Sequence, residues 1–335
     1  MRFILIGVGG FGNVWVNTLK GAANAEVVGL VDRDPVALHK AAQVLGVAQD
    51  RCHTELEAAL ANGQADALIC VTPPTLHREH VVLGLKAGLH VLSEKPMAES
   101  PDDCAAMLQA AKDSGRTYAI SQNYRYGAGM TTLRAAIDGG LIGKIGQVRV
   151  EFYKGHDFKG GFRHEMDFPV LVDMSIHHFD LLRYLTGKNA QSVSASAWNP
   201  PWSNYRGDAS CAVLFEMEGG VRALYNASWC TQGSFSDWNG NWLIEGSRGT
   251  LRYENGVIEH YEVDPHYAVR RQQTLPLLQS EKTPQQHVLD DFVSAIASSQ
   301  QPETSCFDNI HSINMVFGAV DAARNGRRIS LDTLT

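Results

Sequence analysis

The stretch Gly7-Val8-Gly9-Gly10-Phe11-Gly12 decides the fold of the first half of the chain. It fits the pattern G-x-G-x-x-G, which by itself is weakly specific. Its context makes it specific, because an apolar run at residues 2–7 predicts a strand before it and the helical spacing of residues 11–22 predicts a helix after it. A strand, a glycine turn and a helix in this order are typical of a dinucleotide-binding unit.

The residues of this loop have separate roles. Gly7 permits a tight turn, Gly9 lets the backbone approach a pyrophosphate, and Gly12 lets the helix pack closely on the strand. Gly10 and Phe11 lie at the amino terminus of the predicted helix, where N–H groups have no intrahelical partner. We therefore expect this loop to hold the phosphates of a dinucleotide.

Asp32 ends the second predicted strand, 20 residues beyond Gly12. A carboxylate at this place accepts hydrogen bonds from the adenosine ribose, and it repels a 2′-phosphate. Arg33 acts in the opposite sense, because a guanidinium can pair with that phosphate. The sequence therefore favours NAD as the cofactor and leaves NADP as the alternative.

Strands and helices alternate from residue 1 to about residue 122. Buried apolar runs separated by stretches with helical spacing are typical of a parallel sheet covered by helices on both faces. With right-handed crossovers, residues 1–122 should form a Rossmann domain, a doubly wound parallel sheet. The predicted strands are 2–7, 26–32, 66–71, 90–93 and 118–121, and the predicted helices are 11–22, 35–45, 56–61, 76–87 and 101–114.

The pattern changes after Gln122. Short turns such as Glu254-Asn255-Gly256 separate consecutive strands, which indicates an antiparallel sheet. We expect a second domain over residues 123–335, with an open, mostly antiparallel sheet flanked by helices. The predicted strands are 147–153, 192–198, 209–217, 222–229, 242–245, 251–254 and 257–261, and the predicted helices are 130–138, 173–185, 287–297 and 309–325.

The segment 209–217 is apolar on both of its alternating faces. A strand of this kind needs cover on both sides, and the few C-terminal helices should cover only one of them. We therefore expect a second subunit on the other face, in a homodimer or homotetramer formed through the C-terminal sheet. Cover by long loops of the same chain is the alternative.

The composition argues against several functional classes. The 335 residues include 29 basic and 36 acidic side chains, and the net charge of −7 repels the phosphate backbone of nucleic acids. No stretch approaches the roughly 20 apolar residues of a spanning helix, so we expect no membrane association. The six cysteines include no C-x-x-C, which favours a reducing cytoplasm over a disulfide scaffold or a structural zinc site.

Two further loops should lie at the same edge of the sheet as the glycine turn. Thr72 and Pro73 follow one buried strand, and Glu94, Lys95 and Pro96 follow the next. Ligands of open α/β sheets bind at the carboxyl ends of the parallel strands. We therefore expect both loops to belong to the cofactor site.

Several motifs together resemble the Gfo/Idh/MocA oxidoreductases, which are named for glucose–fructose oxidoreductase and inositol dehydrogenase. One is Gly88-Leu89-His90-Val91-Leu92-Ser93-Glu94-Lys95-Pro96, with the Pro73-Pro74 segment that leads to His77. The other is Asp173-x-x-x-His177-x-x-Asp180, in which Ser175 stands where the family usually has glycine. The resemblance covers essentially the whole chain, and the departure at Ser175 bears on local helix packing.

The resemblance implies an NAD(P)-dependent dehydrogenase or reductase that acts on a secondary alcohol or ketone of a sugar, inositol or related polyol. It implies that Lys95, Asp173 and His177 form the catalytic set and contact the substrate. It places His77 and Glu94 in the cofactor site, and it suggests a cis peptide between Lys95 and Pro96.

The oxidation of a CH–OH group removes a hydride and a proton, so the protein must supply a base. On a helix, Asp173 and Asp180 lie four residues before and three after His177, and the two carboxylates flank it on one face. A histidine is mostly neutral at pH 7, whereas a lysine is neutral in roughly 1 of 2,500 molecules. We therefore expect His177 to be the base and Lys95 to stabilise the alkoxide, with a proton relay through Lys95 as the alternative.

Aromatic and polar loops are the candidates for substrate recognition, because polyhydroxylated rings combine apolar CH faces with many hydrogen-bond donors. The candidate residues are Tyr124, Arg125, His156, Arg163 and Trp238. We expect no metal site, since His164-Glu165-Met166-Asp167-Phe168 lacks the second histidine of H-E-x-x-H.

Two other functions are compatible with these motifs. A few relatives keep NAD bound and cleave a glycosidic bond through transient oxidation, in which case product forms without net NADH. A cofactor sensor that binds a transcription factor is the third hypothesis. Intact Lys95, Asp173 and His177 argue against it, because a sensor needs no base.

Overall fold

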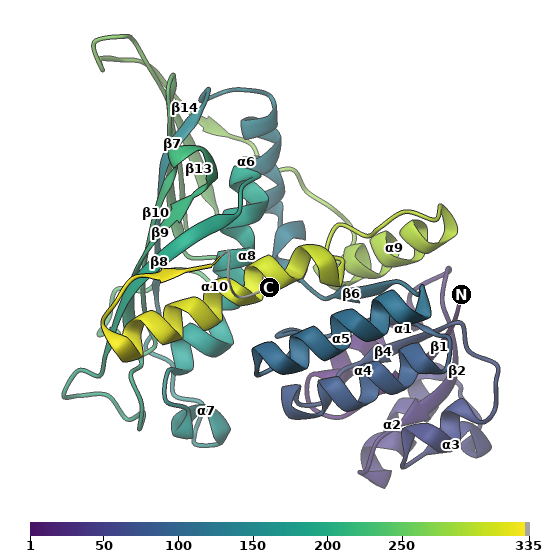
Figure 1. Cartoon of the computed structure of the whole chain (residues 1–335). Helices are drawn as coiled ribbons and strands as arrows, with labels where there is room; N and C mark the ends of the chain where they lie inside the picture. The colour runs from purple at the N-terminus through teal and green to yellow at the C-terminus, as the bar shows by residue number, and fades with distance from the viewer. Residues whose placement is uncertain (332–335) are drawn as a thin grey trace. The chain divides into compact units, whose positions relative to one another are not determined.

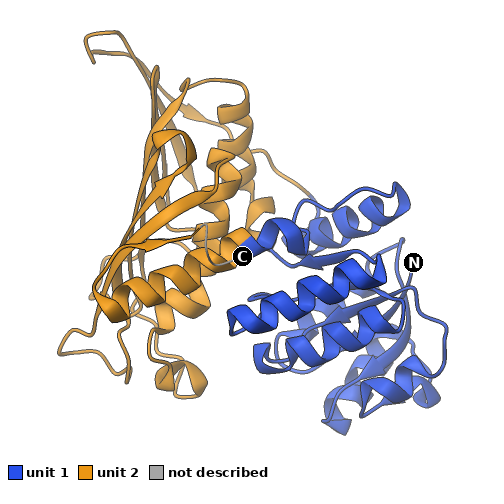
Figure 2. Cartoon of the chain, in the orientation of Figure 1, with its two compact units in different colours: residues 1–123, 281–310 blue, residues 124–280, 311–335 orange. Residues whose placement is uncertain are grey.

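The computed structural model describes residues 1–331 and divides the chain into two compact units (Figure 2). Unit 1 contains residues 1–123 and 281–310, and unit 2 contains residues 124–280 and the chain from His311. The boundary after Asn123 lies one residue from the predicted one. The second crossing of the chain, at residues 281–310, differs from the single boundary that the sequence predicts.

Hydrogen bonds explain why residues 281–310 belong to unit 1. The Ile120 amide, in the last strand of the unit 1 sheet, donates to the Thr304 carbonyl over 3.0 Å. The Asn24 side-chain amide donates to the Asp290 carboxylate over 2.9 Å. Because these partners are far apart in sequence, local patterns along the chain carry no sign of the pairing.

Unit 1 is built on a six-stranded parallel sheet, which confirms the predicted fold (Figure 1). The strands are β1 (Arg2–Ile6), β2 (Glu26–Val31), β3 (Cys52–His53), β4 (Ala67–Cys70), β5 (His90–Ser93) and β6 (Tyr118–Ile120). Their order is β3-β2-β1-β4-β5-β6, and every neighbouring pair is parallel. The strand order reverses between β1 and β4, so ligands are expected at the carboxyl ends of these two strands.

Capping residues define the helix ends of unit 1. The helices are α1 (Gly12–Lys20), α2 (Pro35–Leu45), α3 (Leu56–Leu60), α4 (His77–Lys86), α5 (Pro101–Ser114) and α9 (Pro284–Ala297). Asp34 caps α2 by accepting a hydrogen bond from the Val36 amide, and Ser100 caps α5 in the same way. Both helices begin with proline and end before a left-handed glycine, and their bounds are those predicted.

Unit 2 is built on a nine-stranded sheet in the order β14-β13-β12-β11-β7-β10-β9-β8-β15. Its strands are β7 (Ile145–Tyr153), β8 (Ala190–Trp198), β9 (Ser210–Met217), β10 (Arg222–Ser228), β11 (Asn241–Gly246), β12 (Gly249–Glu254), β13 (Val257–Val263), β14 (Val269–Leu275) and β15 (Ile329–Ser330). Neighbours are antiparallel except β7 and β10, whose connection is long enough for a crossover. The mostly antiparallel sheet confirms the prediction.

Helices cover one face of this sheet (Figure 1). They are α6 (Ala128–Asp138), α8 (Ser175–Thr186) and, from His311 onward, α10 (Cys306–Asn325); the short α7 (Phe162–Glu165) lies in a loop. Residues alternate along β7, where Val148, Val150 and Phe152 are buried while Arg149 and Glu151 are exposed. Within the described residues, the helices therefore pack on one face of the sheet and leave its other face open.

Candidate functional site

The glycine loop connects β1 to α1 at the point where the sheet order reverses. Gly7 has a φ of +84°, and a Cβ there would lie 2.6 Å from the Val71 carbonyl oxygen. A Cβ on Gly12 would lie 2.1 Å from the Gly7 carbonyl oxygen. The nearest neighbour of a Cβ on Gly9 would be the Ala37 Cβ, at 3.7 Å. Two positions thus require glycine for the turn, while Gly9 leaves room for a ligand, as a pyrophosphate cradle needs.

Asp32 supports the glycine loop from the end of β2. One carboxylate oxygen accepts hydrogen bonds from the Val8 and Gly9 amides, over 2.8 and 3.1 Å, and the other accepts from Asp34. Arg33 beside it is exposed. The carboxylate lies where a ribose site was predicted, and it also fixes the loop that would hold the phosphates.

His77 joins the loops that follow β4 and β5. The side chain is fully buried, its Nε2 lies 2.9 Å from the Thr72 carbonyl oxygen, and its Nδ1 lies 2.9 Å from the Pro96 carbonyl oxygen. Both ring nitrogens therefore contact the backbone. His77 therefore joins the two loops that the sequence predicts to belong to the cofactor site.

Glu94 is buried beside the half-buried Lys95. The Trp15 indole N–H donates to Glu94 over 2.8 Å, and the Lys95 amide donates to its other oxygen over 3.2 Å. Desolvation raises the pKa of Glu94. The Lys95–Pro96 peptide is cis, as the resemblance suggested. The sequence motifs do not include Trp15, although an indole N–H on the buried face of a helix signals that an acceptor is needed.

Asp173 and His177 lie on either side of a change in helix type in unit 2. Asp173 is in a π-helix at Val170–Met174, and His177 is in the first turn of α8. The predicted helix over 173–185 is helical throughout, but its first two residues belong to the π-helix. Insertions of this kind often mark functional sites. His177 is buried, and its imidazole stacks on the Tyr124 ring with centroids 4.0 Å apart.

Arg163 pairs with Asp173. Its Nε lies 2.6 Å from one carboxylate oxygen, and its guanidinium lies over the rings of Phe158 and Phe162, at 4.8 and 4.6 Å from their centroids. These contacts bring a predicted substrate residue to a predicted catalytic one within unit 2.

Arg125 and Asp180 form a buried ion pair that sequence analysis missed. The Arg125 Nε and Nη2 donate to the two Asp180 oxygens over 2.6 and 2.7 Å, and the Ser312 hydroxyl donates to one of them over 2.8 Å. The prediction that Asp180 flanks His177 on the helix face differs from this arrangement, since its carboxylate binds Arg125. Arg125 is 4% exposed, so its guanidinium supports the fold beside Tyr124.

Trp238 and His156 lie close together near the end of the sheet. Their rings meet edge to face with centroids 5.6 Å apart, and the Lys154 ammonium lies 5.3 Å from the indole centroid. Trp238 is 41% exposed. The indole thus offers an apolar surface to solvent beside a cation and an imidazole.

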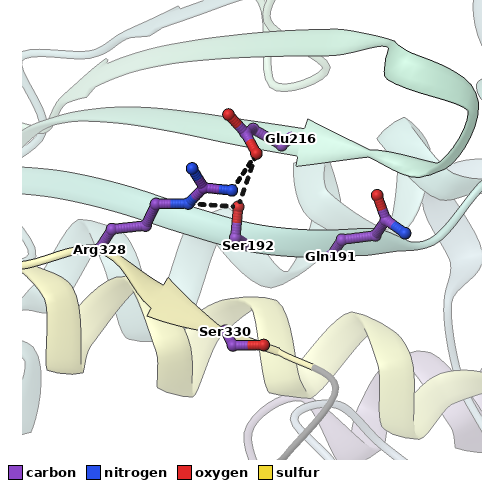
Figure 3. Close-up of a pocket in the computed structure, with 5 residues that line it drawn as sticks. All are labelled: Gln191, Ser192, Glu216, Arg328 and Ser330. Carbon is purple, nitrogen blue, oxygen red and sulfur yellow. Dashed lines mark hydrogen bonds and ion pairs between the residues drawn. The ribbon is translucent and has the colours of Figure 1, made fainter.

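A surface depression in unit 2 lies apart from these residues (Figure 3). It is lined by Gln191, Ser192, Glu216, Arg328 and Ser330. Arg328 pairs with Glu216, and its Nε donates to Ser192 over 2.9 Å, so the charges in the depression compensate one another. None of the predicted site residues lines it. Among residues 1–331, no cluster of His, Cys, Asp or Glu side chains could hold a metal ion, and no helix is long and apolar enough to cross a membrane.

Two family models match this chain, one in each half. Residues 1–122 match the family model described as the oxidoreductase family with an NAD-binding Rossmann fold, GFO_IDH_MocA. Residues 130–274 match the GFO/IDH/MocA C-terminal domain. The NAD-binding assignment agrees with the glycine loop, whose geometry fits a dinucleotide.

Similar proteins align with this chain over nearly the full length of both. D-apiose dehydrogenase of Rhizobium rhizogenes is 24% identical over 100% of this chain and 98% of its own length. Inositol 2-dehydrogenase of Rhizobium meliloti is 25% identical over 99% of both. A crystal structure of an oxidoreductase from Agrobacterium radiobacter, in complex with NAD+, L-tartaric acid and magnesium, has a TM-score of 0.90 at 22% identity and covers 100% of this chain and 99% of that one.

Proposed function

Because the chain belongs to the Gfo/Idh/MocA oxidoreductase family, we propose that it oxidises a secondary alcohol of a sugar, inositol or related polyol, or reduces the corresponding ketone. Members similar to it are named dehydrogenases of a sugar and of inositol. The observation that carries the proposal is the presence of Lys95, Asp173 and His177 in one chain with the glycine loop.

NAD, when bound, supplies the carbon that accepts the hydride. The residues that would hold its phosphates are those of the glycine loop, Gly7, Gly9, Gly10, Phe11 and Gly12. Asp32 would bind the adenosine ribose, and Arg33 would pair with a 2′-phosphate if NADP is used instead. The loops of Thr72–Pro73 and Glu94–Lys95 complete the proposed cofactor site, with His77 joining them.

His177 is the proposed base that accepts the hydroxyl proton. Its stacking on Tyr124 restricts rotation of the imidazole, and burial excludes water from most of the ring. Lys95 is proposed to donate a hydrogen bond to the same oxygen as negative charge develops on it. Asp173 carries the negative charge of the set and is held by Arg163.

The proposed substrate contacts are Lys95, Tyr124, His156, Arg163, Asp173, His177 and Trp238. Trp238 offers an apolar surface to the CH face of a ring, whereas His156 and Arg163 offer donors to its hydroxyl groups. Arg125 is left out of direct contact, because its guanidinium is buried against Asp180, whereas the guanidinium of Arg163 is partly exposed.

The experiment is a screen of absorbance at 340 nm with NAD and NADP over myo-inositol, scyllo-inositol, D-apiose, D-glucose and sorbitol. We expect one or more of them to reduce NAD, and to do so faster than NADP. Release of sugar from a glycoside without NADH would instead indicate glycosidase chemistry. The absence of turnover with every sugar and polyol, together with tight NAD binding, would favour a cofactor sensor.

We also propose that two copies of the chain associate through the open face of the unit 2 sheet. Leu214 and Leu224 pair across β9 and β10 on that face, and they are 41% and 39% exposed. Burial of this apolar surface would stabilise a homodimer or homotetramer. A monomeric mass by light scattering would overturn this proposal. We further propose that the protein is cytoplasmic, because the spacing of its six cysteines favours a reducing compartment.

A further inference from the structure

His178, the residue next to the proposed base, is fully buried in unit 2 and lies on another side of α8. Successive residues of a helix are turned by about 100°. While His177 stacks on Tyr124, the His178 ring lies against Phe152 and Tyr225, at centroid distances of 4.9 and 5.5 Å. One turn of helix therefore presents two imidazoles to two different environments.

The contacts of His178 define where its proton lies. Its Nε2 lies 3.1 Å from the Trp238 carbonyl oxygen, which can only accept, so Nε2 carries the proton. Burial lowers the pKa of His178 to about 4, so the ring is neutral at pH 7 and Nδ1 is an acceptor. The Tyr225 hydroxyl, 2.9 Å away, then donates to Nδ1.

Ser175 extends this chain of hydrogen bonds to the π-helix. Its hydroxyl lies 3.0 Å from the Tyr225 hydroxyl and 2.9 Å from the Val170 carbonyl oxygen, and its one proton is shared between these two acceptors. A glycine at this position, which the family usually has, could make neither contact. The connection from the π-helix through Tyr225 and His178 to Trp238 is thus a feature of this chain's own residues.

The network ends on a loop without regular secondary structure. Residues 229–240 connect β10 to β11, and the Trp238 backbone is anchored to α8 through its carbonyl. The indole itself remains exposed, next to Phe152, His156 and Lys154. The anchor therefore fixes the backbone from which an exposed aromatic face projects.

We propose that His178, Tyr225 and Ser175 are positioning residues that hold Trp238 as a wall of the substrate site and so determine how tightly a polyol ring binds. The proposal rests on the proposed function for its consequence, but the anchoring itself can be measured without a substrate. His178 acts through the Trp238 backbone, and Trp238 contacts the CH face of the ring.

The first test measures the anchor by acrylamide quenching of tryptophan fluorescence. In a Trp198→Phe/Trp202→Phe background, Trp238 is the remaining exposed tryptophan, because Trp15, Trp229 and Trp242 are at most 1% exposed. We expect His178→Phe to raise the quenching constant by about twofold as the loop is released. His178→Gln should restore much of the protection, because its amide supplies both a donor and an acceptor. An unchanged constant in His178→Phe would overturn the proposal.

Tyr225→Phe keeps the anchor testable if His178→Phe fails to fold. It retains the ring and removes only the hydroxyl that donates to Nδ1, so the quenching constant should rise less than in His178→Phe. Circular dichroism in the far ultraviolet establishes that each variant is folded. A Tyr225→Phe protein that quenches as the parent does would remove Tyr225 and Ser175 from the proposal.

The second test uses the fastest substrate of the polyol screen. We expect His178→Phe to raise KM by about fivefold or more with kcat little changed. The reason is that the bound substrate and the transition state would lose the same contact with Trp238. In a Trp238→Ala background, His178→Phe should raise KM no further. An equal effect in both backgrounds would overturn the proposal. If no polyol is oxidised, the proposed function fails, while the quenching result still decides the anchor.

Discussion

The ring of Tyr124 lies nearly parallel to the imidazole of His177, with 4.0 Å between centroids and 15° between planes. Tyr124 precedes Arg125, whose ion pair with Asp180 fixes this segment to α8, the helix that carries His177. Burial raises the pKa of the Tyr124 hydroxyl, so the ring is neutral and its face is electron-rich. A proton accepted by His177 would therefore be stabilised by the ring above it.

Replacement of His177 tests the assignment of the base. We expect His177→Ala to lower kcat by at least ~100-fold, because general-base catalysis of this kind contributes a factor of that order. Cofactor binding, measured by NADH fluorescence, should be retained, since the glycine loop is untouched. Turnover near the wild-type value would reject His177 as the base and favour the relay through Lys95.

Tyr124 can be tested by a pair of substitutions that separate its ring from its hydroxyl. Tyr124→Leu should lower kcat by about fivefold, because an aromatic stack contributes of the order of 1 kcal/mol. Tyr124→Phe retains the stack and should stay within about threefold of wild type. Steady-state kinetics measure both. A larger loss in the phenylalanine variant would show that the hydroxyl, and not the stack, matters.

The Arg125–Asp180 pair should be important for stability. Asp180→Asn leaves a buried guanidinium without a counter-charge, and we expect it to lower the free energy of unfolding by about 3–5 kcal/mol. The matched control is Asp138→Asn, which breaks the exposed Arg134–Asp138 pair on α6 and should cost within about 0.5 kcal/mol. Urea denaturation measures both variants. Equal effects would contradict a special role for the buried pair.

Gly12 should be essential for binding of the cofactor. A Cβ at this position would lie 2.1 Å from the Gly7 carbonyl oxygen, so Gly12→Ala must distort the turn. We expect the Kd for NAD to rise by at least about tenfold, as is typical of overpacking at a tight site. Gly146→Ala is the control, because nothing lies within 4 Å of a Cβ there. Isothermal titration calorimetry measures both, and an unchanged Kd in Gly12→Ala would exclude the predicted cradle.

The local patterns of the sequence predicted most of the fold. Caps and prolines set the bounds of α2 and α5, and turn signals placed the strands of the second sheet. The strands that were missed are β3 and β15, of two residues each, and β14, whose sequence Val-Arg-Arg-Gln-Gln-Thr-Leu is polar and mostly exposed. These strands lie at sheet edges, where burial imposes little hydrophobic pattern.

The side-chain partners of the site were harder to predict. Helical spacing placed Asp173, His177 and Asp180 on one face, but the π-helix moves Asp173 relative to α8 and Asp180 turns to Arg125. Such choices depend on residues far away in sequence, such as Ser312. Motifs therefore predicted which residues form the site, whereas tertiary packing decided what each one contacts.

Acid should weaken the fold through His178. Burial lowers its pKa to about 4, whereas an unfolded histidine titrates near 6.5, so the unfolded state binds more protons between these values. The contribution of His178 to the free energy of unfolding is therefore full above pH 6.5. It falls by about 3 kcal/mol as the pH drops towards 4. Burial lowers the pKa of His77 as well and acts in the same direction. Urea denaturation from pH 7.5 to 4 should give a shallower pH dependence in His178→Gln than in wild type, because glutamine has no proton to gain. Parallel curves would show that folding leaves the pKa of His178 unchanged.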